Sequence, residues 1–287
     1  MRAEGLGQSR TWLSLALLVV AACAGLCRSS QPQWNENDGG VTRSIDVPGG
    51  RLKTRVYTGR AMSKAPILVL VLHGDLPEPA PSYQYEFAKV IADRFENVVA
   101  AGVLRPGYRD PTGAQSSGDM GRAVADNYTP EVVDAVARAA RDLSADHHAH
   151  AILLVGHSGG GAIAANILGR HPGVADGAVL VGCGCDPSRW RARRRAETGN
   201  SIFDGPTRSL LPLEAADAVA PGAIVRMVVG EDDDVAPPAY SQSYAAALQK
   251  RGIDVSVDVV PGLGHNIFFA APVLKAVEDV LRKFPAA

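Results

Sequence analysis

Ser158 is the centre of a Gly-His-Ser-Gly-Gly motif at residues 156–160, between an aliphatic run at 151–155 and a run of small and aliphatic residues at 162–168. Glycine on each side of the serine allows a sharp turn from a strand into a helix, which leaves the hydroxyl exposed at the end of the strand. A serine in this position can act as a nucleophile if the fold supplies a base and a carboxylate. The alternative is a glycine-rich turn that only packs a helix on a sheet.

Two later loops offer these partners. His265 follows the apolar run at 255–260, and the acidic stretch 231–234 follows the apolar run at 224–229. His265 would take the serine proton, and one of the carboxylates would orient the imidazole. Spacing alone does not choose among the four acidic residues. A surface histidine and a solvated acidic loop are the simpler alternatives, and a calcium loop is a weaker one, because the oxygen spacing of such loops is missing.

The negative charge that develops in acyl transfer requires backbone N–H donors near the serine. One donor is expected at Gly159, directly after the nucleophile. The second is expected in the loop after the aliphatic run 67–72, at the N–H of Asp75, with Leu76 as the alternative. We expect His73 to orient this loop rather than to act as a base.

The order of the expected elements predicts the fold class. An antiparallel hairpin at 41–58 precedes strands that alternate with helices, so we expect a mostly parallel central sheet with helices on both faces. In such sheets, functional groups gather at the carboxyl ends of the strands, where every candidate above lies. The expected strands are 67–72, 97–103, 151–155, 178–181, 224–229 and 255–260, and the expected helices are 83–95, 130–144, 162–168, 238–251 and 271–284.

Together these motifs resemble the α/β-hydrolase superfamily from about residue 67 to the C-terminus. The resemblance rests on the family order of serine, acid and histidine, and on four features: His73-Gly74, the motif at 156–160, the acid loop 230–237 and Gly264-His265. The acid loop is similar to a G-x-x-D-x-x-x-P form of the peptidase and esterase branches, and this similarity places the acid on Asp233.

The resemblance implies a serine hydrolase with Ser158, Asp233 and His265 as its catalytic triad. It implies an acyl-enzyme intermediate, no cofactor and no metal, and a small-molecule ester or peptide-like amide as substrate. The choice between ester and amide stays open. The alternatives are a non-catalytic binding protein of the cell envelope with the same fold, and a thiol–disulfide protein that uses Cys183 and Cys185.

Composition fits one globular domain, since 46% of the residues are hydrophobic and 21% are charged. The net charge of −1 argues against nucleic acid as the main partner. Residues 1–27 read as an export signal, and Cys23 lies in a lipoprotein-like processing box; plain cleavage and an uncleaved anchor are the alternatives. We therefore expect an exported protein that is periplasmic, membrane-anchored or secreted, with a tether at 28–40 and a domain at 41–287.

A segment at about 183–222 is longer than a usual connection, and we expect it to form a small cap that selects the substrate. Trp190 in this cap and His157 beside the nucleophile are the expected substrate-binding residues. The basic run 188–195 could meet an acidic substrate or lipid headgroups, or be a solvated helix face. Cys183 and Cys185 are expected to form a structural pair or to be free thiols, and histidines 147, 148 and 150 to form a solvated loop rather than a metal site.

Overall fold

The computed structural model describes residues 36–75 and 80–285. The expected export signal and its Cys23 lie outside these residues. In the described ranges, none of the helices has the length and apolar character to cross a membrane.

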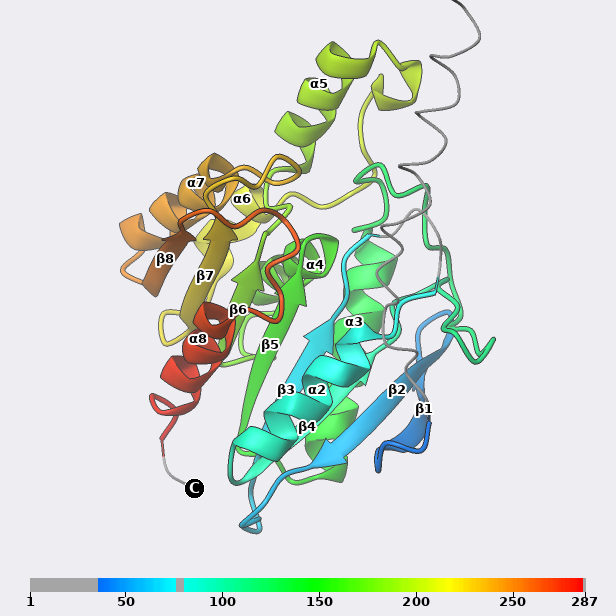
Figure 1. The fold of residues 1–287 in the computed structure, drawn as a ribbon, viewed down its shortest axis with the longest axis vertical. Coiled ribbons are helices and arrows are strands. Elements are labelled where there is room, and N and C mark those ends of the chain that lie inside the picture. The colour runs from blue at the N-terminus through cyan, green and yellow to red at the C-terminus, as the bar shows by residue number, and fades with distance from the viewer. Residues whose placement is uncertain (1–35, 76–79, 286–287) are drawn as a thin grey trace, which may run out of the picture. The chain divides into compact units, whose positions relative to one another are not determined.

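Eight strands form one sheet in the order β1-β2-β4-β3-β5-β6-β7-β8 (Figure 1). The pairs β1–β2 and β2–β4 are antiparallel, and all later pairs are parallel, which confirms the expected fold class. The strands are β1 (Val41–Val47), β2 (Gly50–Thr58), β3 (Ile67–Leu72), β4 (Val98–Val103), β5 (Ala151–His157), β6 (Gly177–Val181), β7 (Ile224–Gly230) and β8 (Asp254–Val260).

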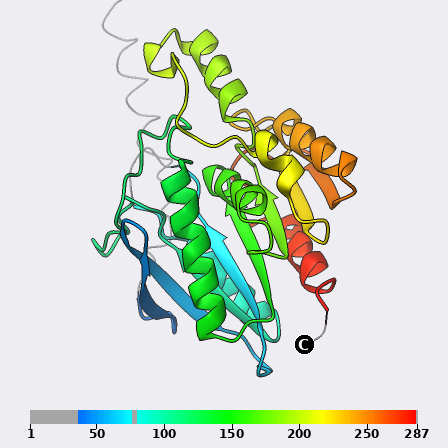
Figure 2. The ribbon, with the colours of Figure 1, turned by 180° about the vertical axis from the view of Figure 1, so that it is seen from behind.

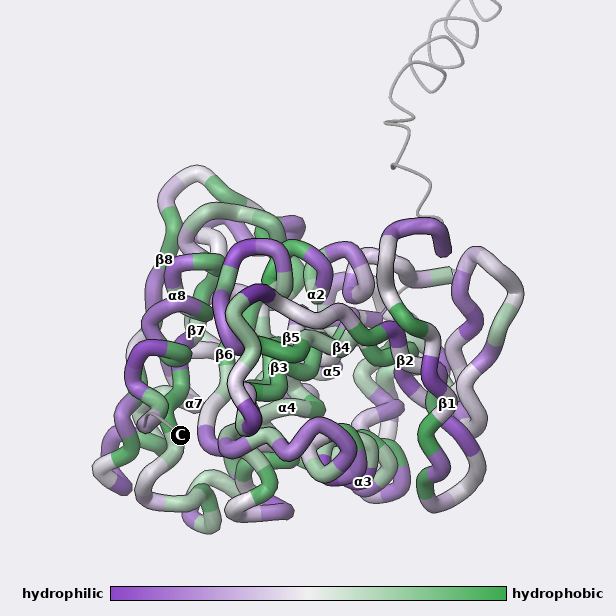
Figure 3. The backbone as a smooth tube through the Cα atoms, turned by 90° about the horizontal axis from the view of Figure 1, so that it is seen from below, coloured by the Kyte–Doolittle hydropathy of each residue, from purple (hydrophilic) through white to green (hydrophobic). Residues whose placement is uncertain are grey.

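The central strands are buried because their sequences are aliphatic on both faces. Every residue of β4 and β5 is buried, and so is β3 after Ile67. Figure 3 shows these strands as the hydrophobic centre of the molecule. By contrast, β8 alternates exposed and half-buried residues, as expected for an edge strand.

Helices cover both faces of the sheet. The first face carries α2 (Tyr83–Arg94) and α8 (Ala271–Leu281), and the second carries α3 (Pro130–Asp146), α4 (Gly159–Arg170) and α7 (Pro238–Lys250) (Figures 1 and 2). Crossovers of this kind bring the carboxyl ends of the parallel strands, and the loops that follow them, to a single edge of the sheet.

The segment between β6 and β7 contains α5 (Pro187–Thr198), which stands beyond the carboxyl ends of the strands (Figure 1), and the short α6 (Pro212–Ala215). Arginines of the basic run hold α5 in place. Arg191 is buried and donates to the carbonyls of Val124 and Ile202, at 2.8 and 3.1 Å. Arg193 donates to the carbonyls of Asp234 and Val235, at 2.7 and 3.0 Å. These two arginines therefore serve the fold, unlike those of a solvated helix face.

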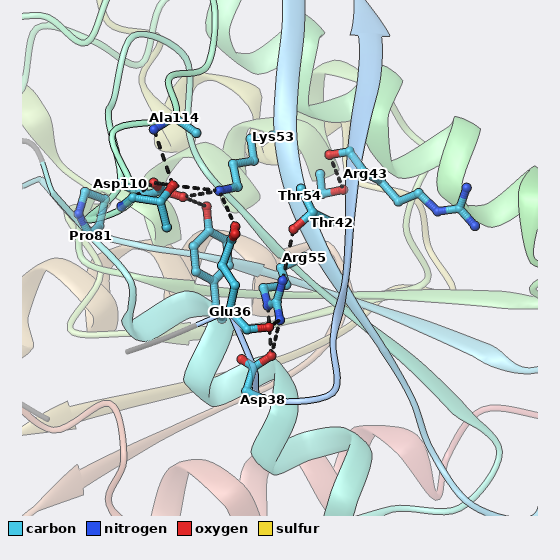
Figure 4. A network of polar contacts seen from close by, with 12 residues as sticks. Glu36, Asp38, Thr42, Arg43, Lys53, Thr54, Arg55, Pro81, Asp110 and Ala114 are labelled. Carbon is cyan, nitrogen blue, oxygen red and sulfur yellow. Dashed lines mark hydrogen bonds and ion pairs between the residues drawn. The ribbon is translucent and has the colours of Figure 1, made fainter. Parts of the chain in front are cut away.

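A polar network attaches the start of the described chain to β2 (Figure 4). Glu36 accepts a hydrogen bond from Lys53 at 3.0 Å, and Asp38 is paired with Arg55. Lys53 also forms an ion pair with the fully buried Asp110, at 2.7 Å. The segment expected as a tether through residue 40 thus contacts the sheet from Glu36 onward.

We predict that Lys53→Met lowers the free energy of unfolding by about 3 kcal/mol, because the Asp110 carboxylate would lose its cation while it stays buried. Denaturation in urea measures the loss. Arg51→Met is the matched control on the same strand. The Arg51–Asp46 pair has side-chain exposures of 70% and 81%, so its removal should change stability by less than about 0.5 kcal/mol. Equal effects of the two changes would contradict the prediction.

Candidate active site

Ser158 lies on a sharp turn between β5 and α4. Its φ of 52° and ψ of −118° are rare for a residue with a side chain. The turn holds this conformation because its flanking glycines allow main-chain contact. A Cβ on Gly156 would lie 2.4 Å from the carbonyl oxygen of Gly160, and a Cβ on Gly160 would lie 2.5 Å from that of His73. The strand–turn–helix expected from the motif is thus present.

His265 and Asp233 meet at the ends of β8 and β7. The Nδ1 atom of His265 lies 2.9 and 3.0 Å from the two carboxylate oxygens of Asp233. Asp233 also accepts the N–H groups of Val235 and Ala236, at 3.0 and 2.7 Å, and is only 3% exposed. The other acidic residues of the stretch 231–234 are exposed. Burial and these bonds therefore distinguish Asp233 from its neighbours, which spacing alone could not do.

The carboxylate sets the tautomer of the His265 ring. Because Asp233 only accepts hydrogen bonds, Nδ1 carries the proton and Nε2 is left with a free lone pair, which is the form a general base requires. His265 and Ser158 line the same pocket, but no hydrogen bond joins the Ser158 hydroxyl to the ring within the described residues. In enzymes without substrate this bond is often long, and it tightens when substrate is bound.

His73 fixes the peptide between Gly74 and Asp75. Its Nδ1 donates to the carbonyl of Gly74 at 2.8 Å, and its Nε2 accepts the N–H of Arg105 at 3.1 Å. Burial first, and then Arg105, hold the pKa of His73 well below its ordinary value, so the ring is neutral. In a trans peptide the N–H points away from the C=O. The bond to Gly74 therefore directs the N–H of Asp75, as expected of a residue that orients this loop.

The Asp75 side chain is anchored beside the expected oxyanion donor. Tyr128 donates its hydroxyl to Asp75 at 2.6 Å, and Arg105 lies 2.9 Å from the other carboxylate oxygen. Arg105 is fully buried, and although burial lowers its pKa, Asp75 and the neighbouring tyrosines raise it above the ordinary value. A Cβ on Gly159 would lie 2.4 Å from the Asp75 carboxylate, so the Asp75 side chain packs directly against Gly159.

A pocket of about 460 Å³ opens between these loops and α5. Its wall includes Ser158, His265 and Asp75, and Trp190 of α5 lies in it as the sequence led us to expect. The remaining wall is largely apolar and is formed by Ala123, Ala125, Gly184, Pro187, Val235 and Ala236, with Tyr128 and Arg122. The cap segment thus contributes directly to the pocket.

His157 does not lie in this wall. Its ring is buried, with Nδ1 2.9 Å from the hydroxyl of Tyr83 and Nε2 3.1 Å from the carbonyl oxygen of His265. The expectation that His157 binds substrate does not fit this placement, because both ring nitrogens are used within the protein. Tyr83 was missed by the sequence analysis, since nothing in its local pattern distinguishes it from other apolar positions of α2.

Cys183 and Cys185 form a disulfide directly after β6. The N–H of Gly184 between them donates to the Ser158 carbonyl at 3.3 Å, so the pair is tied to the pocket wall beside Ser158. Over residues 36–75 and 80–285, no group of histidine, cysteine and acidic side chains has the arrangement of a metal site. His150, one of the histidines of residues 147–150, bonds through Nδ1 to the carbonyl of Ala65 at 2.7 Å.

The family described as Hydrolase_4, serine aminopeptidase S33, matches residues 110–203. This match includes Ser158 but not Asp233, His265 or the loop at 73–75. No curated protein matches the sequence of the chain.

Solved structures with similar folds include peptidases and an esterase. The acylaminoacyl peptidase of Pyrococcus horikoshii is 15% identical with a TM-score of 0.65, over 85% of this chain and 41% of that one. A puromycin-hydrolyzing peptidase of Mycobacterium tuberculosis is 18% identical with a TM-score of 0.63, over 85% of this chain and 39% of that one. This chain thus spans about two fifths of either peptidase.

The esterase Est2 of Thermogutta terrifontis, from the Planctomycetes, is 18% identical to the chain with a TM-score of 0.62. The match covers 86% of this chain and 92% of the esterase. At these identities the likeness concerns the fold.

We predict that Gly160→Ala lowers stability by about 1–3 kcal/mol, because the added Cβ would press on the carbonyl oxygens of Leu72 and His73. Gly184→Ala is the control variant. Its Cβ would lie 3.7 Å from its nearest neighbour, the hydroxyl of Tyr128, which is an ordinary contact. Urea denaturation of both variants measures the difference. If Gly160→Ala is as stable as Gly184→Ala, the close approach of α4 to the end of β3 is not a constraint.

Proposed function

The chain belongs to the α/β-hydrolase superfamily, and we propose that it is a serine hydrolase that cleaves a carboxylic ester or a peptide-like amide. The observation that carries the proposal is the buried Asp233–His265 pair, which meets Ser158 at one pocket. A protein that only binds a ligand has no need of a nucleophile on a strained turn beside an oriented imidazole.

The reaction proceeds in two halves. Ser158 attacks the acyl carbonyl carbon while His265 Nε2 accepts the hydroxyl proton, and Asp233 stabilises the imidazolium that results. His265 then gives this proton to the leaving alcohol or amine as the bond to the acyl carbon breaks. Water then attacks the acyl carbon while His265 takes one of its protons, and His265 returns that proton to the Ser158 oxygen as its bond to the acyl carbon breaks and the carboxylic acid leaves. The proton thus moves only between groups that belong to the site or to the substrate.

Stabilisation of the tetrahedral intermediate is assigned to the N–H groups of Gly159 and Asp75. The Gly159 N–H lies at the N-terminus of α4, where the helix dipole favours negative charge. The Asp75 N–H is directed by the bond from His73 to the Gly74 carbonyl. Because these donors belong to fixed peptides, little reorganisation is needed when the oxyanion forms.

The pocket wall indicates the class of acyl group. Apolar residues form most of it, and Trp190 offers an aromatic face. We therefore propose a small substrate with an apolar part, in keeping with solved relatives that include an acylaminoacyl peptidase and an esterase. Turnover of nitrophenyl esters of varied chain length, beside aminoacyl amides, decides between ester and amide.

For the location of the protein, we propose export, with the protein either released after plain cleavage to the periplasm or the medium, or attached to a membrane through a lipid on Cys23 or an uncleaved signal. The support is the sequence pattern of residues 1–27 alone. The intact mass of the mature N-terminus distinguishes lipidation from simple cleavage, and a mature protein that retains an unmodified residue 1 and fractionates as soluble would contradict both.

Ser158→Ala is expected to reduce turnover by roughly 10⁶-fold and to abolish labelling by a fluorophosphonate probe, because the nucleophilic oxygen is removed. Ser243→Ala is the control, since that hydroxyl donates within α7 to the carbonyl of Ala239 at 2.8 Å. Labelling that survives Ser158→Ala would reject the assignment. A folded wild-type protein that is neither labelled nor active would favour the binding-protein alternative.

Asp233→Asn is expected to lower kcat by about 10⁴-fold, because the amide no longer selects the base form of His265. Asp232→Asn changes an exposed neighbour in the same loop and should leave kcat nearly unchanged. Steady-state kinetics of both variants on one ester measure the difference. Similar losses in both would mean that the acid loop acts through its general charge and not through the bond to His265.

A further inference from the structure

A chain of hydrogen bonds joins the three loops that supply the site at the carboxyl ends of β3, β5 and β8. It begins at the N–H of Gly74, which donates to the hydroxyl of Tyr83. That hydroxyl lies 2.9 Å from His157 Nδ1, and His157 Nε2 lies 3.1 Å from the carbonyl oxygen of His265. This series of hydrogen bonds therefore connects the expected oxyanion loop at Gly74, the turn before Ser158 and the loop of His265.

The two main-chain groups at the ends of this series determine which atom donates in each hydrogen bond. The carbonyl oxygen of His265 can only accept, so Nε2 of His157 carries the proton and Nδ1 does not. Nδ1 must then accept from the hydroxyl of Tyr83, whose oxygen is left to accept the N–H of Gly74. One arrangement of protons satisfies all members, and it requires a neutral His157.

The surroundings of His157 favour that neutral form. Burial first, and then the charge of His265, lower the pKa of His157 to about 4. The ring also packs against Phe268, with 5.2 Å between ring centres, and against His265 at 5.0 Å. His157 is thus held in one orientation and one tautomer while His265 gains and loses a proton.

Neither Tyr83 nor His157 lies in the wall of the pocket that contains Ser158. We propose that Tyr83 and His157 are positioning residues, which hold the oxyanion loop and the His265 loop in register with the nucleophile. The proposal rests on the proposed function. The hydrogen bonds connect both the Gly74 main chain and the His265 main chain to His157, the residue before Ser158. Loss of any one of these bonds would allow a loop to move relative to the serine.

Tyr83→Phe removes one oxygen and breaks two bonds of the chain, while the ring can keep its contact with Phe268 at 5.6 Å between centres. We expect kcat to fall by roughly 10–100-fold, as for small misplacements of reacting groups, with KM nearly unchanged because the pocket wall is untouched. Tyr85→Phe is the matched control on the same helix. Its hydroxyl donates to Asp110 at 3.2 Å, away from the site, so its loss should leave kcat unchanged.

A double-mutant cycle tests whether the two residues act in series. His157→Leu should lower kcat about as much as Tyr83→Phe, and the double variant should lose little more than either single one, because each change already breaks the chain. His157→Gln keeps one donor and one acceptor without a titrating ring, and it should retain more kcat than His157→Leu.

Multiplied losses in the double variant would overturn the proposal, as would equal losses for the Gln and Leu variants or a rise in KM with kcat unchanged. A loss of stability in Tyr83→Phe with wild-type kcat would also overturn it and leave a structural role only. Fluorophosphonate labelling of Ser158 in the wild-type protein separates this failure from failure of the hydrolase proposal, because labelling would persist when only the positioning role is wrong.

Discussion

The contact between the first turn of α4 and the ends of β3 and β5 is the constraint on which the site depends. A Cβ on Gly156 would overlap the carbonyl oxygen of Gly160, and a Cβ on Gly160 would overlap the carbonyl oxygens of Leu72 and His73, so the main chain is in direct contact at both places. This approach holds Ser158 at its positive φ and sets Gly159 against Asp75. A side chain at position 160 would push the start of α4 away from the loop that carries Asp75.

Around this contact, most buried polar groups are bonded or ion-paired within the protein, although among the described residues one carboxylate oxygen of Asp75 and two guanidinium nitrogens of Arg105 have no hydrogen-bond partner. His73 and His157 are neutral rings with both nitrogens bonded, and Arg105 is a buried cation beside the carboxylate of Asp75. Since an unpaired buried polar group costs about 1–3 kcal/mol, these bonds strongly favour one arrangement of the loops. The region behind Ser158 is therefore held by specific polar bonds, while the pocket wall under α5 is largely apolar.

The sheet and its helices could be predicted because the aliphatic runs of β3, β4 and β5 are distinct and the glycines mark the turns. Helix caps were less predictable. Thr129 is of a residue type favoured at the N-cap and precedes α3, but its side chain makes no capping bond. The hydrogen-bond partners of Arg191 and Arg193 could not be predicted from the sequence either. Both side chains donate to backbone carbonyl oxygens of distant loops, and every residue has such a carbonyl.

In the site, Ser158 and the loop of His265 could be found from local motifs, and Asp233 needed the family pattern before its burial set it apart. The placement of His157 away from the pocket was not predictable, because proximity in sequence to Ser158 does not say which side of the turn a side chain takes. Its partner Tyr83 is 74 positions away. Long-range hydrogen bonds between side chains leave no periodic signal along the chain, which is why the whole Gly74–Tyr83–His157–His265 chain became visible only in three dimensions.

The anchoring of α5 has a consequence for how the pocket could adapt to larger ligands. Arg193 donates hydrogen bonds to the carbonyls of Asp234 and Val235, the two residues that follow Asp233, the proposed catalytic acid. Outward displacement of α5 would therefore also move the loop after β7, which positions the Asp233 carboxylate beside the imidazole of His265. A wider pocket entrance under α5 and an unchanged contact between Asp233 and His265 therefore exclude one another as long as Arg193 keeps its bonds. If the chain acts as proposed, variants selected for bulky acyl groups should change first at position 193.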